Sequence, residues 1–335
     1  MLRYVARRLV TMVLVWVGVI ILTFIIANVV PRDPVRLRLG PRATADQVAA
    51  LRKEYGLDLP LPMQFVRYVE NLAQGNLGTS LWSERPVLDD LVDYVPATVE
   101  LSGAALLITL LVGVPLGVAA AAKKGSALDR VASAIATFAV ASPAFWIGTV
   151  GQIVFYRALG WFPLQGQIDQ VLGPPARITG LFVVDSVLSG DVPRLLSSLD
   201  HLVLPALALS LWPAAAVFRQ VRSSVLETMS TDYVRTAKAK GLPARAVLWG
   251  HVFRNSLLPL LSIFGFITAA LLSGTFVIEV VFGWPGVGWY ATQEILASDY
   301  FGTIAITLVI AVIVTTVNLI VDLGYSVVDP RIRYS

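Results

Sequence analysis

The chain has 335 residues, of which 56% are hydrophobic and only 14% are charged, and it contains no cysteine. Soluble domains are about 45–50% apolar and about 25% charged, so this chain has too few charges to cover a water-exposed surface. The absence of cysteine excludes disulfides, zinc–thiolate sites, iron–sulfur clusters and cysteine nucleophiles. The formal net charge of +4 does not by itself indicate a nucleic-acid partner, because its meaning depends on where the basic residues lie.

The sequence contains six charge-free apolar runs of the length that a membrane span requires. A helix needs about 20 residues to cross a hydrocarbon core of about 30 Å, and within lipid every backbone polar group must be paired inside the chain. We therefore expect an all-α polytopic membrane protein with six transmembrane helices. The runs are Leu9–Val30, Leu101–Ala122, Val131–Tyr156, Leu202–Phe218, Asn255–Ile278 and Tyr300–Val321.

The first run follows a short basic segment, Met1–Arg8, and is 22 residues long. The apolar core of a signal peptide has only about 7–15 residues. We therefore expect residues 1–30 to form a cytoplasmic tip and a retained first helix. Cleavage of this segment as a signal peptide is the alternative.

The remaining segments divide by composition. Residues 31–96 mix charges, aromatic residues and turn residues, which predicts an extracytoplasmic loop or small subdomain, with an amphipathic stretch at Thr44–Tyr55 that Thr44 can cap. Residues 97–326 form the expected five-helix core, and residues 327–335 a cytoplasmic tail. The apolar stretch Ile178–Leu188 is too short to span, so we expect it on the membrane surface or packed on the bundle.

Proline and small residues recur within the predicted spans. Proline removes a backbone hydrogen bond and kinks a helix, and the spans contain Pro115, Pro143, Pro205, Pro213 and Pro259. Ordinary helix packing and a gating hinge both remain possible roles for these kinks. Small residues, as at Gly113, Gly117 and Gly148–Gly151, permit close helix contact in lipid and indicate a packed bundle.

The placement of Lys and Arg predicts the orientation of the helices, because short cytoplasmic loops carry an excess of these residues. With the N-terminus in the cytoplasm, residues 1–8, 123–130, 219–254 and 322–335 lie inside and hold 15 of the 26 basic residues. The last outside loop, about 282–299, holds none. We therefore expect both termini to face the cytoplasm.

The longest cytoplasmic segment, residues 219–254, is also the most basic. Gly241-Leu242-Pro243 separates two helical stretches within it, with Gly241 placed as a helix C-cap and Pro243 compatible with a first helical turn. A basic amphipathic segment that binds anionic lipid headgroups is the simplest interpretation. However, Ala237, Ala239 and Gly241 leave a smooth surface at a helix end, which favours docking into a groove of another protein.

This segment resembles the cytoplasmic coupling loop of binding-protein-dependent ABC importer permeases, whose consensus is Glu-Ala-Ala, three residues, Gly, and then a spacer leading to Leu-Pro. Ala237 and Gly241 match the second Ala and the Gly. Arg235 and Thr236 replace the Glu and the first Ala. Leu258-Pro259 matches the closing Leu-Pro at a longer spacing.

The resemblance covers nearly the whole chain and is closest to the dipeptide/oligopeptide branch of that family. Six further motifs occur in the order of that branch, although Arg32 replaces its usual Gly. They are Arg7-Arg8-Leu9, Pro31–Pro34, Gly75–Ser80, Pro96–Leu101, Pro285–Gly288 and the tail from Asn318 to Tyr334.

The resemblance implies a type I ABC importer permease fold and a subunit of the bacterial or archaeal cytoplasmic (inner) membrane. Its implied partners are a second homologous permease, two ATPase subunits, an extracytoplasmic solute-binding protein and the lipid bilayer, with no nucleic acid. ATP and Mg would be bound by the ATPase subunits, and this chain would bind no cofactor. The residues expected to couple to the ATPase, within about 231–249, are Arg235, Ala237, Lys238, Gly241 and Leu242.

Several chemistries have no matching motif in the sequence. The phosphate-cradling pattern Gly-x4-Gly-Lys-Ser/Thr is absent, so we expect no ATP binding and no enzyme activity from this chain itself. The two histidines, His201 and His251, lie in different predicted segments and form no metal pair. Glu100, Glu279 and Asp322 fall near the ends of predicted helices, so no central acidic relay supports a proton-driven carrier.

The predicted function is therefore a permease subunit that forms half of a translocation pathway for dipeptides or oligopeptides, with solute contacts expected from helices two to five. Nickel complexes, glutathione or oligosaccharides are alternative solutes. An ion-coupled secondary transporter is a further alternative, and a membrane-embedded hydrolase lacks a convincing nucleophile–base pair.

Overall fold

The computed structural model describes residues 2–29, 39, 43–54, 57–80, 82–297 and 299–328. The motif at Pro31–Pro34 and the tail beyond Val328 lie outside this part of the chain. The described residues form helices and connecting turns, with one isolated β-bridge between Thr79 and Pro86. The expected all-α fold is therefore confirmed.

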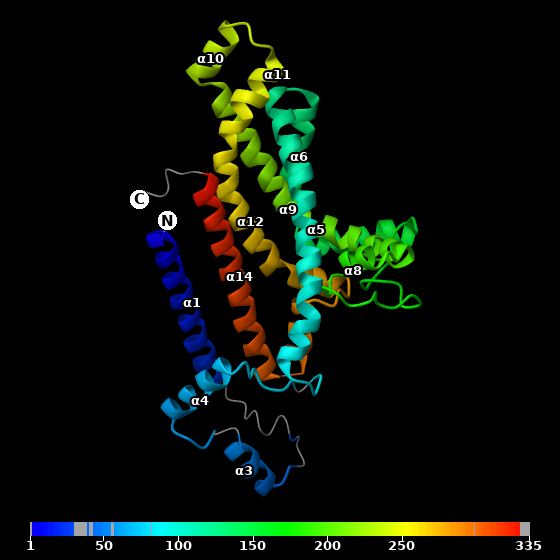
Figure 1. Cartoon of the computed structure of the whole chain (residues 1–335). Helices are drawn as coiled ribbons and strands as arrows, with labels where there is room; N and C mark the ends of the chain where they lie inside the picture. Colours follow the sequence, from blue (N-terminus) through cyan, green and yellow to red (C-terminus); the bar gives the residue numbers. More distant parts are fainter. Residues whose placement is uncertain are drawn as a thin grey trace.

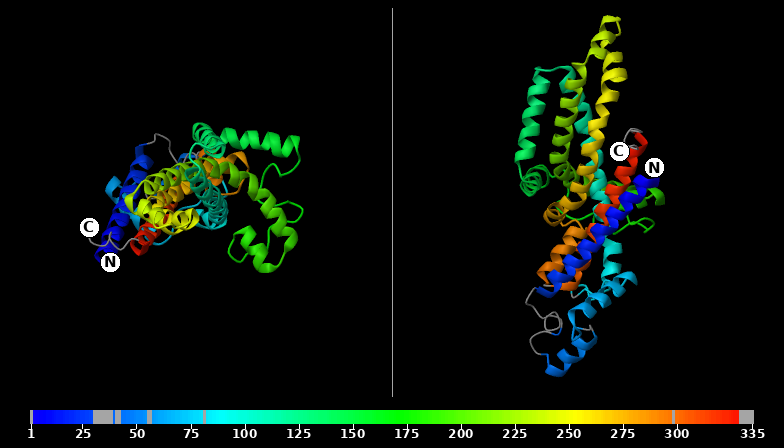
Figure 2. Two further views of the ribbon diagram at one scale, coloured as in Figure 1. Left: turned by 90° about the horizontal axis from the view of Figure 1, so that it is seen from above. Right: turned by 90° about the vertical axis from the view of Figure 1, so that its left-hand side faces the viewer.

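The centre of the molecule is a bundle of three long helices, α5 (Val87–Ala122), α9 (Val192–Met229) and α12 (Arg254–Val281). Helices α1 (Leu2–Val29) and α14 (Tyr300–Val328) lie side by side along one flank of this bundle (Figures 1 and 2). The Trp16 indole joins these two flanking helices by donating a 2.7 Å hydrogen bond to Thr315 Oγ1. The most extensive helix contact is that of α5 with α9.

Shorter helices complete the structure. Two lie near the C-terminal end of α1, and the remainder connect the long helices. They are α3 (Ala45–Glu54), α4 (Leu61–Ala73), α6 (Ala127–Ala141), α7 (Ala144–Gly151), the π-helix η1 (Gln152–Ala158), α8 (Phe182–Ser189), α10 (Asp232–Ala239), α11 (Ala244–Ala246), the π-helix η2 (Val247–Phe253) and α13 (Val287–Leu296).

The six predicted spans correspond to four long apolar helices and two bent pairs in the described part of the chain. The first bent pair corrects the prediction for Val131–Tyr156, because this run is not one continuous helix. α6 and the α7–η1 segment meet at 108°. Pro143 disfavours a helical conformation at the preceding residue, and Ser142 is extended, with φ −93° and ψ 131°. Pro205 and Pro213, in contrast, lie inside the continuous helix α9.

Two predictions outside the spans can also be compared with the structure. Thr44 caps α3 as expected: Gln47 N–H donates to its hydroxyl at 3.3 Å and Thr44 N–H donates to Gln47 Oε1 at 3.0 Å, which is a capping box. The stretch Ile178–Leu188 includes all but the last residue of α8, which packs against α9 and α5. Helix α5 begins at Val87, so helical structure extends into the expected outer loop.

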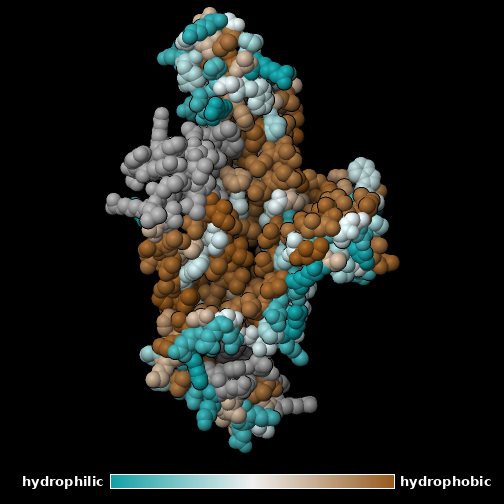
Figure 3. Space-filling view, in the orientation of Figure 1, coloured by the Kyte–Doolittle hydropathy of each residue, from teal (hydrophilic) through white to brown (hydrophobic). Residues whose placement is uncertain are grey.

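The surface supports a position in the bilayer. Only 6% of the apolar window in α1 is buried, and many of its large side chains are exposed. On the face shown in Figure 3, the middle of the molecule is mostly hydrophobic and the two ends are mostly hydrophilic. Exposed apolar surface on this scale would be unstable in water, so the chain is a multi-pass membrane protein. α10 lies at one end of the long axis, and α3 and α4 lie at the other (Figure 1).

Glycine allows α5 and α9 to approach closely, as the sequence predicts. A Cβ atom added at Gly113 would lie 2.9 Å from the Ala214 carbonyl oxygen, and one added at Gly117 would lie 2.9 Å from the Phe218 carbonyl oxygen. Both clashes involve backbone atoms, which cannot rotate away. Helix contact in lipid depends on such close packing because no hydrophobic driving force acts between helices there.

We expect Gly117→Ala to destabilise the protein by about 1–3 kcal/mol, because α9 must move to admit the methyl group. The matched control is Gly103→Ala on the same helix, where an added Cβ meets nothing within 4 Å. Thermal unfolding in detergent measures both variants. Equal melting temperatures for the two would contradict the close packing of α5 against α9.

Candidate functional site

The predicted coupling loop forms a helical hairpin at one end of the molecule, between α9 and α12 (Figure 1). α10 ends in a Schellman motif, in which Gly241 N–H donates to the Lys238 carbonyl at 3.0 Å and Leu242 N–H to the Ala237 carbonyl at 3.4 Å. Gly241 has a φ of +78°, a conformation that glycine adopts without strain. The predicted helix end at Gly241 is therefore confirmed, and α11 begins directly after Pro243.

The five predicted coupling residues differ in exposure. Ala237 is only 7% exposed and packs with the core, so it supports α10 from the inner side. The other four point outward: Leu242 is 40% exposed, and Arg235, Lys238 and Gly241 are also exposed. The hairpin tip thus combines two exposed basic side chains, Arg235 and Lys238, with one exposed apolar side chain, Leu242.

A shallow groove lies beside this tip, lined by Pro243, Arg245, Ala246 and Trp249. Trp249 is half exposed. The groove and Leu242 provide an apolar contact surface within a basic segment. This combination suits a protein partner better than it suits lipid headgroups alone, which need only the positive charge.

Side-chain hydrogen bonds fix the base of the hairpin to the bundle. Ser256 Oγ on α12 donates to Thr228 Oγ1 on α9 at 3.1 Å, and Asn255 Nδ2 donates to the Tyr233 hydroxyl on α10 at 3.1 Å. α10 is therefore attached by a side chain to α12, and α12 is in turn joined to α9.

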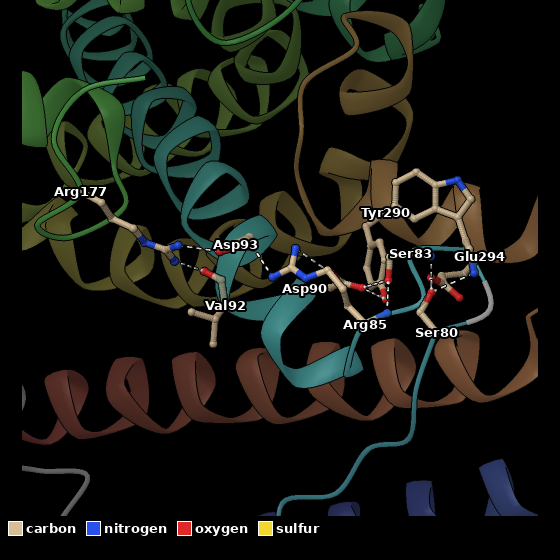
Figure 4. Close-up of polar contacts among 10 residues, drawn as sticks. Ser80, Ser83, Arg85, Asp90, Val92, Asp93, Arg177, Tyr290 and Glu294 are labelled. Atoms are coloured by element: carbon tan, nitrogen blue, oxygen red, sulfur yellow. Dashed lines mark hydrogen bonds and ion pairs between the residues drawn. The ribbon is translucent and has the colours of Figure 1, made fainter. Parts of the chain in front are cut away.

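The opposite end of the molecule contains a polar network that sequence reasoning missed (Figure 4). Asp90 on α5 accepts a hydrogen bond from the Tyr290 hydroxyl on α13 at 3.0 Å and another from the Ser83 hydroxyl. Arg85 bridges two carboxylates, at 3.2 Å from Asp90 Oδ1 and 3.0 Å from Asp93 Oδ2. The network joins the loop before α5 to α13.

Arg177 extends this network to the loop after η1. Its Nη1 lies 2.6 Å from Asp93 Oδ1, and its Nη2 donates to the Val92 carbonyl at 3.0 Å. The residue four positions after Val92 is Pro96, which has no N–H, so the Val92 carbonyl has lost its normal helical donor. Arg177 supplies that donor and allows α5 to continue through Pro96.

A second buried carboxylate holds the start of α13. Glu279 on α12 is fully buried and accepts hydrogen bonds from Gly288 N–H at 2.7 Å, Trp289 N–H at 3.0 Å and Thr98 Oγ1 at 2.7 Å. The first two donors belong to the first turn of α13, whose N–H groups have no helical partners. A carboxylate at a helix N-terminus is also favoured by the helix dipole.

Close packing explains the glycines of the motif Pro285–Gly288. A Cβ atom at Gly288 would lie 2.5 Å from Phe276 Cα, and one at Gly286 would lie 2.4 Å from the Glu279 carboxyl. The adjacent Trp284 is fully buried and donates its indole N–H to the Ala97 carbonyl on α5 at 2.8 Å. The motif therefore locks α5, α12 and α13 together.

Glu100 on α5 is, like Glu279, a buried carboxylate that joins separate elements by accepting hydrogen bonds. It is nearly buried, and it accepts hydrogen bonds from Gln167 Nε2 at 3.0 Å and Val183 N–H at 2.7 Å. The sequence suggested that Glu100 lies near the end of a helix. Because α5 begins at Val87, Glu100 instead lies within the helix. Its burial next to polar groups of the 159–181 loop and α8 could only be found from the tertiary structure.

Comparison with known proteins identifies the family. Residues 113–334 match the model of the binding-protein-dependent transport system inner membrane component, and residues 1–102 match the model of its N-terminal segment. The chain belongs to this family of transport proteins. The two matches together include the hairpin at 231–249 and both halves of the polar network.

Curated relatives cover almost the full length of the chain. The probable D,D-dipeptide transport system permease protein DdpB of Escherichia coli is 41% identical over 96% of this chain and 94% of its own length. The dipeptide transport system permease protein DppB of Alkalihalophilus pseudofirmus is 38% identical over the whole of both chains. The di/tripeptide transport system permease protein DppB of Pseudomonas aeruginosa is 38% identical over 100% of this chain and 99% of its own length.

Glu294 on α13 gives the network a titratable member outside the spans. It is fully buried and accepts a 2.6 Å hydrogen bond from the Ser80 hydroxyl. Burial raises the pKa of Glu294 from 4.5 to about 7, and the neighbouring Asp299 carboxyl adds to this rise while Ser80 opposes it. Between about pH 4.5 and pH 7, Glu294 is therefore protonated in the folded protein but mostly ionised in the unfolded chain.

We expect the stability of the protein to decrease as the pH rises from about 4.5 to about 7, because over this range the folded state binds more protons than the unfolded state. Glu294→Gln, which mimics the protonated carboxyl, should flatten this part of the profile. Glu70→Gln on the exposed side of α4 is the control and should leave it unchanged. Melting temperatures across this pH range provide the measurement, and an unaltered slope in Glu294→Gln would contradict the assignment.

Proposed function

We propose that this chain is one of two permease subunits of an ATP-driven importer of dipeptides and similar short peptides. The observation that carries the proposal is full-length similarity: relatives 38–41% identical over at least 94% of their own length are named as permeases for D,D-dipeptides, dipeptides or di- and tripeptides. Nickel complexes, glutathione and oligosaccharides are less favoured solutes because none of these relatives is named for them.

In this proposal the hairpin of α10 and α11 is the attachment point of an ATPase subunit. Its support is the exposed tip of Arg235, Lys238, Gly241 and Leu242 beside an apolar groove. A hydrogen bond joins α10 to α12, and another joins α12 to α9. ATP and Mg bind to the two ATPase subunits. The hairpin then lies in the cytoplasm, as do both termini, in agreement with the distribution of basic residues.

The opposite end, with its network around Asp90 and Asp93, then faces the solute-binding protein. Transport follows from two alternating states of the permease pair, since a partner that binds one state more tightly shifts the population toward it. Closure of the ATPase pair moves α10, and through it α9 and α12. The hydrogen bonds of the buried Glu279 and Glu100 carboxyls keep the outer parts of α5, α12 and α13 moving as one body.

Reconstitution tests the function directly. Vesicles that contain this chain, a homologous partner permease and both ATPase subunits should accumulate a labelled dipeptide only when the binding protein and ATP are present. Vesicles with this chain alone should accumulate none. Uptake by the chain alone in response to an ion gradient would replace the proposal with an ion-coupled secondary transporter.

The attachment point is tested with two equivalent glycines. We expect Gly241→Asp to reduce the ATPase that co-purifies with the permease by about tenfold, equivalent to about 1.4 kcal/mol of binding free energy, because the tip gains a negative charge and a side chain. Gly125→Asp is the matched control: both glycines have φ +78°, and a Cβ at either meets nothing within 4 Å.

Both variants place the same new charge on a glycine with the same φ, one at the hairpin tip and one in the turn between α5 and α6. Equal ATPase recovery from Gly241→Asp and Gly125→Asp would remove the hairpin tip from the interface. Membrane insertion of both variants should be normal, which is measured by the amount of chain in the membrane fraction.

A further inference from the structure

Helix α4 has two apolar faces, and only one of them packs against the part of the chain that the structure describes. The packed face contacts α1: the ring centroids of Phe65 and Phe24 are 5.1 Å apart and those of Tyr68 and Phe24 are 5.9 Å apart. The hydroxyls of Tyr68 and Thr23 are 3.4 Å apart. These contacts attach the middle of α4 to a specific level of α1.

That level lies within the membrane span. The apolar window of α1 extends from Ala6 to Ile26, so Phe24 is two residues before its end. With a rise of 1.5 Å per residue, the contact is about 3 Å inside the end of the window and about 9 Å inside the end of the apolar run at Val30. Because about 20 apolar residues match the hydrocarbon thickness, the middle of α4 lies at the boundary between acyl chains and headgroups.

The second apolar face of α4 is exposed at this level. Val66 is 54% exposed and Val69 is 37% exposed, and each follows directly after a residue of the packed face, Phe65 and Tyr68. Residues three apart share one side of a helix, so Val66 and Val69 form a stripe next to the packed stripe. Arg67, Glu70 and Asn71 are exposed and lie on the opposite, polar side of the helix.

The surface of α1 is also apolar and exposed at this level. Near the same end of α1, Leu22, Ile25 and Ile26 are 59%, 49% and 56% exposed. A helix with one apolar and one polar side, attached at the edge of the hydrocarbon, satisfies both sides by lying in the interface. Tyrosine is also typical of this level, since its ring is apolar and its hydroxyl polar.

We propose that α4 is an interfacial helix whose Val66–Val69 stripe is buried in the acyl-chain boundary of the bilayer, while Arg67, Glu70 and Asn71 face the headgroups and water. The occupant of this face is lipid and not a protein partner. Helix α4 then anchors the segment before α5 at the membrane surface. The depth of α4 is independent of which side of the membrane faces the cytoplasm and of which solute is transported.

The lack of cysteine in this chain makes a site-directed spin-labelling test simple. Single cysteines replace Val66 and Val69 on the apolar stripe, and Arg67 and Asn71 on the polar side serve as matched controls on the same helix. Each full-length variant is labelled with a nitroxide in lipid vesicles. Its accessibility is measured to oxygen, which concentrates in acyl chains, and to a water-soluble nickel chelate.

We expect a several-fold higher ratio of oxygen to nickel accessibility at V66C and V69C than at R67C and N71C, both for the chain alone and for the assembled transporter. Equal nickel accessibility at all four positions would place α4 in water and overturn the proposal. Low accessibility of V66C and V69C to both reagents would mean that a protein covers the stripe, and this would also overturn it. All four side chains are exposed, so unchanged melting temperatures serve as the folding control.

Discussion

The lipid interior offers no hydrogen-bond partners, so each polar group near it must be satisfied by the protein itself. Much of this structure follows from that constraint. The carbonyl of Val92, deprived of its helical donor by Pro96, receives a hydrogen bond from Arg177. The first N–H groups of α13 are capped by Glu279, and Glu100 accepts from the 159–181 loop and α8. In each case the partner comes from a distant part of the sequence, so satisfying the polar group also joins two elements.

The two ends of the bundle satisfy their polar groups in different ways. At the α10 end, the hairpin hydrogen-bonds mainly within itself and to α9 and α12, and its tip remains exposed. At the other end, charged and hydroxyl side chains of α5, α13 and two loops join one another, with Asp90 and Glu294 almost completely buried. The first arrangement leaves a surface free for a partner, whereas the second gives rigidity. Under the proposed function, the first end contacts the ATPase and the second faces the solute-binding protein.

Proline shows how the same local signal has different outcomes. Pro143 ends α6, and the chain turns by 108°, while Pro205 and Pro213 remain within α9 and Pro96 and Pro115 within α5. In each position the proline removes one hydrogen bond. At Pro96 the side chain of Arg177 compensates for this loss. Such neighbours cannot be identified from the residues around the proline.

The sequence by itself determined the class of protein, the number of apolar segments, the cap of α3 at Thr44 and the helix end at Gly241. These features depend on composition, on length relative to the bilayer or on residues within one turn, so local physical chemistry is sufficient. Only the tertiary structure placed Ala237 inside and Leu242 outside, divided Val131–Tyr156 into two helices, and brought Arg177 to Val92 and Ser80 to Glu294. The last two contacts join residues that are 85 and 214 positions apart, and no periodic pattern along the chain encodes such pairs.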